Sequence, residues 1–509
     1  GMLVGIYEIN HKHWNMDGAP WDYGIELIQE DIDRISDELE MAFARYPVLT
    51  EVGVKSWVNG AFTFSPDGNP LVGPVSTVPN YWLACGVMAG FSQGGGVGLM
   101  LAQWMIEGES QYDMFAWDVA RFGKWADEAF TKERVRDQYA NRFSIHFPNE
   151  ERAAGRPVRV RPAHDLQKSM GAVMGLNYGW EHPLWFAEEV GTKDTNGFTR
   201  QNWFEPVGTE ARMLREHAGI IDISNFAKYF VKGAGAADWL NAVFANNMPK
   251  LVGRSCLTPL IGVRGGIAGD FTVTKLSDDE FMIIGGGMSE RYHSRFWKMV
   301  PLPEGTTFES RTDAMCGFNV AGPKSRELLT RLTNADLSTA AFPFMRSQQI
   351  EIAGVPVVAL RVSFTGDLGW ELHCEQADQL KLYEALLDAG KAVGAGPVGS
   401  RALMSLRVEK GYGSWSREYS PEYWPQEVSL AGLIKLEKEF LHKDAYLRIK
   451  DNAPREVMSL IHVTEVTTAD ATGGEPIFLT DGTPVGRVSS GTYGYGVEMS
   501  LALGYLKGV

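Results

Sequence analysis

Residues 257–276, LTPLIGVRGGIAGDFTVTKL, decide how the chain folds. The pattern predicts an apolar strand, a tight turn at residues 264–266, and a second strand through Phe271. Because side chains alternate along a strand, Asp270 and Thr272 face away from Phe271. A carboxylate at the mouth of such a hairpin can hold or deprotonate a cationic amine, and it can equally cap the turn. The stretch alone leaves both interpretations open.

Composition narrows the class of protein. The chain has 509 residues, 44% of them hydrophobic, which predicts roughly three or four domains with large buried cores. The net charge of -15 disfavours nucleic acid and anionic membranes as partners, so we expect a small-molecule substrate. No apolar run reaches the roughly 18 residues that would predict a membrane-spanning helix. The four cysteines form no CxxC and predict free, buried thiols in the cytoplasm, or in the mitochondrial matrix of a eukaryote. Composition does not fix the oligomeric state.

The order of predicted elements indicates an α+β fold. Upstream, 2–9 and 54–64 are predicted strands, and 24–45 is a predicted acidic, amphipathic helix. Between about 209 and 430, strands and helices alternate without the regular rhythm of a doubly wound sheet. Helices are expected at 208–217, 235–245, 289–299, 323–333, 376–392 and 400–410. Strands are expected at 227–232, 269–276, 280–285, 316–320, 349–353, 356–362 and 369–373. From about 440 the chain is rich in strands and glycine turns.

A glycine run at 90–95, GFSQGG, is predicted to be a loop between a strand and a helix. That geometry presents backbone N–H groups and the positive end of a helix dipole to an anionic or electron-rich ligand. A plain helix start packed against a sheet is the alternative. The run also matches the G-x-S-x-G nucleophile elbow, but no oxyanion loop precedes it, so a hydrolase is disfavoured. The G-x-G-x-x-G match at 394–399 follows a helix and predicts a helix end. No metal-ligand spacing appears, so we expect no metal.

A second set of candidates lies between residues 363 and 415. Residues 363–371, SFTGDLGWE, predict a turn feeding a strand. The carboxylate of Glu371, next to Trp370, suits bidentate recognition of a pterin or purine edge, although an ordinary edge-strand glutamate fits equally well. Arg407, on a predicted helix, can pair with Glu409 or with a ligand carboxylate. An aromatic group that can cover a flat ring follows at Tyr412, Trp415 and Trp424.

Taken together, these stretches resemble a known family. Five blocks resemble the tetrahydrofolate-binding aminomethyltransferase of the glycine cleavage system: TPLIGVRGGIAGDFTVTKL (258–276), FNVAGPKSRELL (318–329), RVSFTGDLGWELH (361–373), GSRALMSLRVEKGYGSW (399–415) and PQEVSLAGLIKLEKEFLHKDAYL (425–447). Three upstream blocks resemble the flavin-dependent sarcosine and dimethylglycine dehydrogenases: FTFSPDGNPLVGPV (62–75), WLACGVMAGFSQGGGVGLMLAQWMIEG (82–108) and MGLNYGWEHPLWFA (174–187).

The resemblance implies roles for individual residues. Asp270 matches the catalytic carboxylate that acts on a folate ring nitrogen, and Gly269 stands where many relatives carry a second acid. Folate-binding roles fall on Thr272, Ser363, Phe364, Thr365, Trp370, Glu371, Arg407 and Trp415. Backbone contact with the flavin ring falls on Gly90, Phe91, Ser92, Gln93, Gly94 and Gly95.

The resemblance also implies a domain order and a function. We expect the C-terminal part of an FAD-dependent oxidoreductase domain at 1–120, a connector at 121–205, an aminomethyltransferase-like folate domain at 206–430 and a barrel-like domain at 431–509. No G-x-G-x-x-G unit that grips the FAD pyrophosphate is present. The chain therefore resembles a fragment that does not hold FAD alone. The implied function is oxidation of sarcosine or dimethylglycine, with the one-carbon unit captured as 5,10-methylene-tetrahydrofolate. A folate-dependent aminomethyltransferase or demethylase without redox activity, and a non-catalytic folate-binding subunit, are the alternatives.

Overall fold

The computed structural model describes residues 2–466 and 468–508, which form an α+β protein as the sequence predicts. The chain divides into two compact units. The first contains the residues up to Ala102 together with Ala116–His146 and Arg152–Val158, and the second contains Gln103–Phe115, Phe147–Glu151 and the residues from Arg159 onward. No helix in the described part of the chain is long and apolar enough to cross a membrane.

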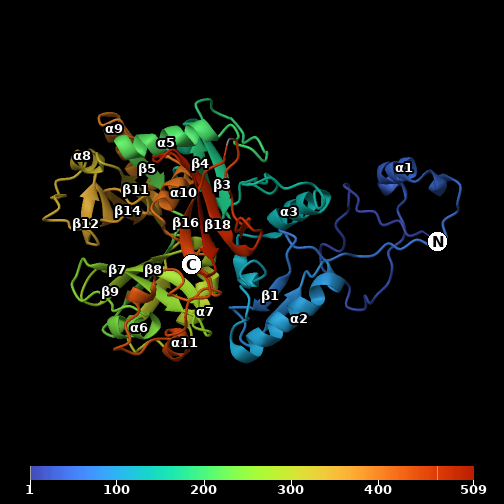
Figure 1. The fold of residues 1–509 in the computed structure, drawn as a ribbon, viewed down its shortest axis with the longest axis horizontal. Coiled ribbons are helices and arrows are strands. Elements are labelled where there is room, and N and C mark those ends of the chain that lie inside the picture. Colours follow the sequence, from blue (N-terminus) through green and yellow to red (C-terminus); the bar gives the residue numbers. More distant parts are fainter. Residues whose placement is uncertain (1, 467, 509) are drawn as a thin grey trace. The chain divides into compact units, whose positions relative to one another are not determined.

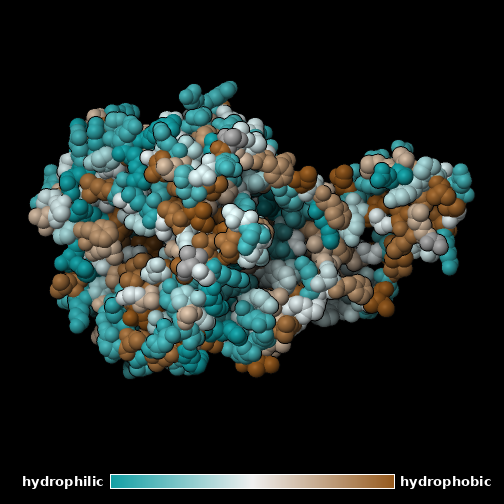
Figure 2. All heavy atoms as spheres, in the orientation of Figure 1, coloured by the Kyte–Doolittle hydropathy of each residue, from teal (hydrophilic) through white to brown (hydrophobic). Residues whose placement is uncertain are grey.

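The first unit has little regular structure before residue 70. Its elements are α1 (Ser36–Arg45), β1 (Leu71–Pro74), β2 (Trp82–Cys85), most of α2 (Gly90–Glu107) and α3 (Glu128–Ala140). The strands predicted at 2–9 and 54–64 are wrong, and the predicted helix at 24–45 forms only from Ser36. Without a paired sheet, apolar side chains stay at the surface, so that Trp21 and Ile25 are fully exposed. Figure 2 shows hydrophobic residues at the surface of the part that contains the N-terminus.

The glycine run at 90–95 is helical, which corrects the predicted loop. Gly90 is the first residue of α2, and the run forms the first turns of that helix. No atom lies within 4 Å of the position that a Cβ would take on Gly90, Gly94 or Gly95. These glycines therefore leave an open helix face, and they do not shape a turn.

Two sheets form the centre of the second unit. The five-stranded sheet, in the order β10-β6-β9-β8-β7, contains β6 (Ala227–Lys232), β7 (Ser255–Ile261), β8 (Ile267–Lys275), β9 (Glu280–Gly285) and β10 (Thr307–Ser310). The six-stranded sheet, in the order β12-β13-β14-β11-β5-β15, contains β5 (Gly219–Asp222), β11 (Met315–Ala321), β12 (Ser347–Ile352), β13 (Val355–Leu360), β14 (Gly369–Glu375) and β15 (Gly396–Val398). The strands predicted between 227 and 373 are all present, with ends shifted by no more than about two residues.

Helices cover the outer faces of these sheets (Figure 1). Around the six-stranded sheet lie α5 (Phe204–Glu216), α8 (Ser325–Thr330) and α9 (Gln379–Lys391). Around the five-stranded sheet lie α6 (Ala236–Val243) and α7 (Glu290–Trp297), while α10 (Ser400–Glu409) packs on α5. Four smaller elements complete the order before and after this region: α4 (His164–Ser169), β3 (Ala172–Asn177), β4 (Trp180–Phe186) and α11 (Lys443–Ile449). The last part is a four-stranded sheet of β16 (Val457–Val463), β17 (Pro476–Phe478), β18 (Pro484–Gly494) and β19 (Met499–Leu506).

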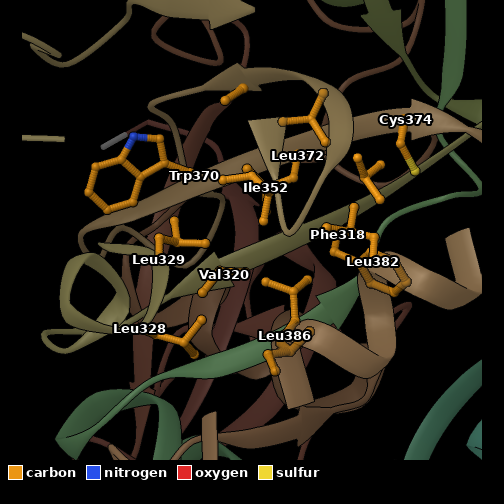
Figure 3. Packing of buried hydrophobic residues seen from close by; sticks show 14 of the residues in the cluster. Phe318, Val320, Leu328, Leu329, Ile352, Trp370, Leu372, Cys374, Leu382 and Leu386 are labelled. Atoms are coloured by element: carbon orange, nitrogen blue, oxygen red, sulfur yellow. The ribbon is translucent and has the colours of Figure 1, made fainter. Parts of the chain in front are cut away.

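A large apolar core lies under the six-stranded sheet. All seven residues of β11 are buried, because the strand runs through the middle of the sheet with neighbours on both sides. Figure 3 shows Phe318 and Trp370 in this cluster with Leu372 and Cys374. Cys316 and Cys374 are buried as predicted, but Cys85 is exposed, so the expectation of buried thiols holds only in part.

Candidate functional site

Asp270 lies on β8, opposite Pro259 of β7, in the predicted hairpin. The turn requires Gly265 in the left-handed region, with φ of 87°, where a Cβ would meet the side chain of Ile449 at 2.8 Å. Asp270 is only partly exposed, and burial raises the pKa of its carboxyl from 3.8 to about 6. Burial raises the pKa of Tyr419 as well, and the charge of Asp270 adds to that shift, which places the phenol near the carboxylate.

The residues beside Asp270 line one face of the five-stranded sheet. Thr272 is in register with Ile284 of β9, and Ile284 is in register with Lys228 of β6. Paired residues on neighbouring strands project to the same face, so these three side chains form a row across the sheet. Asp270 lies two residues before Thr272 and shares that face.

This face turns toward the six-stranded sheet. Ile284 packs in one apolar cluster with Leu360 of β13, and Leu360 is in register with Glu371 of β14. The carboxylate of Glu371 acts electrostatically on the ammonium of Lys228, which is fully buried. Asp270 and Thr272 therefore lie on the sheet face that carries Ile284, and Glu371 lies on the sheet face that carries Leu360, with which Ile284 packs.

Lys228 is a buried cation at this place. Its Nζ donates to the carbonyl oxygens of Ser224, at 3.0 Å, and Phe226, at 2.9 Å. Burial, followed by the charge of Arg161, lowers the pKa of Lys228 to about 8, and Glu371 is among the groups that oppose this shift. The Glu371 side chain is 19% exposed and its Oε2 lies 3.3 Å from Nε2 of the buried His373. This carboxylate is therefore accessible on one side and electrostatically supported on the other.

The loop at 363–367 lies beside Glu371. Asn319 of β11 is in register with Glu371, and its Oδ1 accepts a hydrogen bond from Ser363 at 3.2 Å. Ser363 and Thr365 share a hydrogen bond of 2.8 Å between their hydroxyl groups. Asp367 anchors the loop, because its two carboxylate oxygens each lie 2.7 Å from the guanidinium of Arg215. Phe364 stacks on Tyr412 with a centroid distance of 6.1 Å.

The structure does not bring Trp370 to this space. Alternation along β14 turns its indole to the opposite face from Glu371, into the apolar core seen in Figure 3. The side chain is fully buried, so it supports the sheet from behind.

Arg407 is committed to a partner within the protein. Its fully buried guanidinium pairs with the fully buried Glu418 at 2.8 Å and also donates to the backbone oxygen of Tyr412 and to Ser490. Glu409, the partner considered from the sequence, pairs with Arg215 instead. Arg407 therefore fixes the loop that carries Trp415 and Tyr419, and geometry gives it no direct ligand contact.

Trp415 packs against α7, with its ring 5.1 Å from His293 and 5.7 Å from Tyr292. Its indole Nε1 is buried and makes no hydrogen bond among the described residues. The indole nitrogens of Trp370 and Trp297 and Nε of Arg407 are unsatisfied in the same way, so this feature does not single out Trp415. Trp424 lies elsewhere, under the guanidinium of Arg455 at 4.1 Å, so the predicted aromatic group does not gather at one place.

The missing second acid has a steric explanation. A Cβ on Gly269 would lie 2.7 Å from the ring of Phe271 and 2.8 Å from Nε2 of His293. His293 is fully buried and packs behind β8, where its Nε2 lies 3.1 Å from the oxygen of Ala268. No side chain fits at Gly269 without moving this packing, so Asp270 is the single acid of the strand pair.

Several residues in the site or directly behind it were not singled out from the sequence: Lys228, Asn319, His293 and Tyr419. Two of them carried a signal, since Lys228 and Asn319 are polar residues inside otherwise apolar strand segments. His293 and Tyr419 reach the site through tertiary contacts that no local pattern encodes.

Comparison with known proteins assigns each part of this architecture to a family. The family described as the GCVT N-terminal domain matches residues 163–438, and the glycine cleavage T-protein C-terminal barrel domain matches 459–509. The FAD dependent oxidoreductase family matches residues 4–104, and its central domain matches 107–160. The solved aminomethyltransferase T of the glycine cleavage system from Bartonella henselae has the same fold, with a TM-score of 0.59 and 22% identity over 69% of this chain and 90% of that one.

Two curated relatives are similar along 99% of this chain. Mitochondrial dimethylglycine dehydrogenase from Mus musculus is 38% identical, and mitochondrial sarcosine dehydrogenase from the same organism is 31% identical. The chain spans 59% of the length of each. The fold and site thus define a protein with an aminomethyltransferase-like domain joined to a flavin-oxidoreductase segment. The chain belongs to the family described as the GCVT N-terminal domain.

Proposed function

We propose that the space between the two sheets binds tetrahydrofolate and that Asp270 acts there in one-carbon transfer. The parent reaction is oxidation of an N-methyl amine, dimethylglycine or sarcosine, by an FAD-dependent domain, with capture of the one-carbon unit as 5,10-methylene-tetrahydrofolate. The observation that carries this proposal is the raised pKa of Asp270, whose carboxyl shares a sheet face with the hydroxyl of Thr272.

The groups present fit a reduced pterin. A pterin edge offers adjacent N–H donors, and an ionised carboxylate such as Glu371 accepts two parallel hydrogen bonds from such an edge. The hydroxyl of Thr272, on the same sheet face as Asp270, adds a hydrogen-bond donor and acceptor.

Asp270 has the properties of a general base or an ammonium-binding group. With a pKa of about 6, its carboxyl is ionised at neutral pH, yet it is basic enough to take a proton from a nitrogen that loses one during carbon–nitrogen bond formation. Burial also strengthens its attraction for a cationic nitrogen. Tyr419 and the loop fixed by Arg407 hold the surroundings of this carboxylate in place.

The flavin supplies hydride acceptance in the complete reaction. In this chain, residues 90–95 at the start of α2 would contact the flavin. The glycines there carry no side chains, which permits close approach of a flat ring. Phe91 is fully exposed on this helix.

The test is a transfer assay with a matched pair of variants. Asp270→Asn keeps the size of the side chain and removes the base, whereas Asp278→Asn removes an exposed carboxylate from the next turn of the same hairpin sheet. We expect Asp270→Asn to lower formation of methylene-tetrahydrofolate from tetrahydrofolate and formaldehyde by about 100-fold or more. Asp278→Asn should stay within about twofold of the parent chain. Equal rates for the two variants would contradict the role of Asp270.

A further inference from the structure

Arg215, in the last turn of α5, joins two carboxylates that lie far from each other in the sequence. Its Nη1 donates to both oxygens of Asp367 at 2.7 Å, and its Nη2 donates to Glu409 at 2.9 Å. The side chains of Asp367 and Glu409 are 17% and 3% exposed, so solvent screens these ion pairs only weakly. Burial lowers the pKa of the Arg215 guanidinium, but the two carboxylates more than compensate, so that the pKa is raised overall. Arg215 therefore stays charged and bound to both partners.

The two carboxylates belong to different parts of the proposed folate site. Asp367 ends the loop 363–367, whereas Glu409 is the last residue of α10. The backbone of the loop also packs directly on the residue after α10, because a Cβ on Gly366 would lie 2.7 Å from Cγ of Lys410. Gly366 has a φ of 74°, which a glycine adopts without strain. Arg215 thus holds the loop against the end of α10.

The position of Asp367 is passed on to the hydroxyl groups of the loop. The backbone N–H of Asp367 donates to Oγ1 of Thr365 at 3.4 Å, and the hydroxyl of Thr365 shares its hydrogen bond with Ser363. Ser363 in turn donates to Asn319 of β11. A shift of Asp367 therefore displaces the two loop hydroxyls that the sequence resemblance assigns to folate.

Glu409 has a second contact, in the C-terminal sheet. Its Oε1 accepts the backbone N–H of Gly496 at 2.8 Å, and Gly496 lies in the turn between β18 and β19. A Cβ on Gly496 would lie 2.7 Å from Oε2 of Glu409, the oxygen that accepts from Arg215. The turn of the C-terminal sheet therefore fixes the carboxylate that fixes Arg215.

We propose that Arg215 is a positioning residue of the folate site: it sets the conformation of the loop 363–367 and, through Glu409, makes that conformation depend on the C-terminal sheet. The inference rests on the proposed function, because the loop acts on a ligand only if folate binds beside it. A guanidinium suits this task, since its two terminal nitrogens serve two carboxylates at once, whereas a lysine has a single nitrogen. Without a cation, Asp367 and Glu409 repel each other and the loop moves away from α10.

The first experiment is a fluorescence titration with tetrahydrofolate. We expect Arg215→Gln to bind at least about tenfold more weakly, because the loop loses a charge-assisted link, and Arg215→Lys to fall between this variant and the unaltered chain. Arg212→Gln, which removes an exposed arginine from the same helix, should stay within about twofold. A merely structural ion pair would lower the melting temperature and leave the affinity of the folded molecules unchanged.

A double-variant cycle tests whether Arg215 acts through Asp367. Asp367→Asn keeps the shape of the side chain and should weaken tetrahydrofolate binding by a similar factor. The double variant should bind no more than about twofold more weakly than Arg215→Gln alone, because both changes break the same link. Losses that multiply in the double variant would overturn the proposal. If Arg215→Gln does not fold, Asp367→Asn decides, and undiminished affinity of that variant would overturn the proposal as well.

The dependence on the C-terminal sheet has its own test. Gly496→Ala pushes on the carboxylate of Glu409 and should weaken tetrahydrofolate binding at least about threefold. Gly432→Ala is the control, because no atom lies within 4 Å of the position of its Cβ, and it should stay within about twofold. Equal affinities of the two alanine variants would overturn the link from the sheet to the loop.

Hydrogen exchange without ligand separates this inference from the proposed function. Amides in a peptide covering 361–368 should exchange faster in Arg215→Gln than in the unaltered chain, and Arg212→Gln should show no change. Unchanged exchange in Arg215→Gln would overturn the positioning role. An unaltered chain that does not bind tetrahydrofolate would overturn the proposed function and this inference with it. Equal binding by the unaltered chain and Arg215→Gln would overturn this inference alone.

Discussion

Replacing Asp270 with asparagine should stabilise the sheet that carries it. The folded-state pKa of about 6 lies above the ordinary value of 3.8, so the native state binds this proton more tightly than the unfolded chain does. The ionised carboxylate therefore lowers the free energy of unfolding. This loss of stability is absent below about pH 4 and complete above about pH 6. A shift of about two pH units corresponds to about 3 kcal/mol at about 1.4 kcal/mol per unit. Asparagine avoids that cost, so Asp270→Asn should gain up to about 3 kcal/mol at pH 8 and progressively less as the pH falls toward 4.

The appropriate assay is hydrogen exchange of backbone amides in peptides covering β8 and β9, measured from pH 5 to pH 8 and corrected for intrinsic exchange rates. This assay reports the opening free energy of the five-stranded sheet itself, whereas a whole-chain melt mixes two units. Asp278→Asn, an exposed change in the same sheet, should stay within about 0.5 kcal/mol. A destabilised Asp270→Asn variant at pH 8, or a gain that does not depend on pH, would refute the assignment of Asp270 as a buried acid held at a cost.

Two further predictions concern the support of the site. Arg407→Met leaves Glu418 buried without its partner, which should lower the free energy of unfolding by about 3–5 kcal/mol, measured by thermal melting. The double variant with Glu418→Gln should recover part of that loss. An unchanged melting midpoint for the single variant would contradict the pairing. Gly269→Ala places a Cβ 2.7 Å from the ring of Phe271, so overpacking should lower the free energy of unfolding by about 1–3 kcal/mol, measured by urea unfolding. An unchanged free energy of unfolding would show that His293 and Phe271 can move to make room for the methyl group.

Much of the second unit could be predicted from sequence, because its strands and helices are strongly periodic. The hairpin of β7 and β8 follows directly from the apolar strand, the glycine turn and the alternation around Asp270. The first unit was harder. Its apolar segments at 2–9 and 54–64 carry strand-like composition, but strands form only when a neighbouring strand satisfies their backbone, and no such neighbour exists in the described structure.

Only those features of the candidate site that depend on the alternation of side chains within one strand could be predicted from the sequence. Alternation places Asp270 beside Thr272 and separates Glu371 from Trp370, yet it gives no information about which face of one sheet meets which face of the other. That information comes from Ile284 packing on Leu360. The role of Arg407 could not be predicted either, because its partner Glu418 lies eleven residues further along the chain in an irregular loop.

A titration with tetrahydrofolate tests the central claim most directly. The chain, Glu371→Gln and Glu375→Gln would be compared, because Glu375 lies on the same strand with an exposed carboxylate paired to Arg311. Loss of a charge-assisted pair costs about 1.5–3 kcal/mol, which corresponds to at least about tenfold weaker binding. The site between the sheets predicts that Glu371→Gln binds tetrahydrofolate at least tenfold more weakly while Glu375→Gln binds like the parent chain. Equal affinity of all three proteins would contradict it.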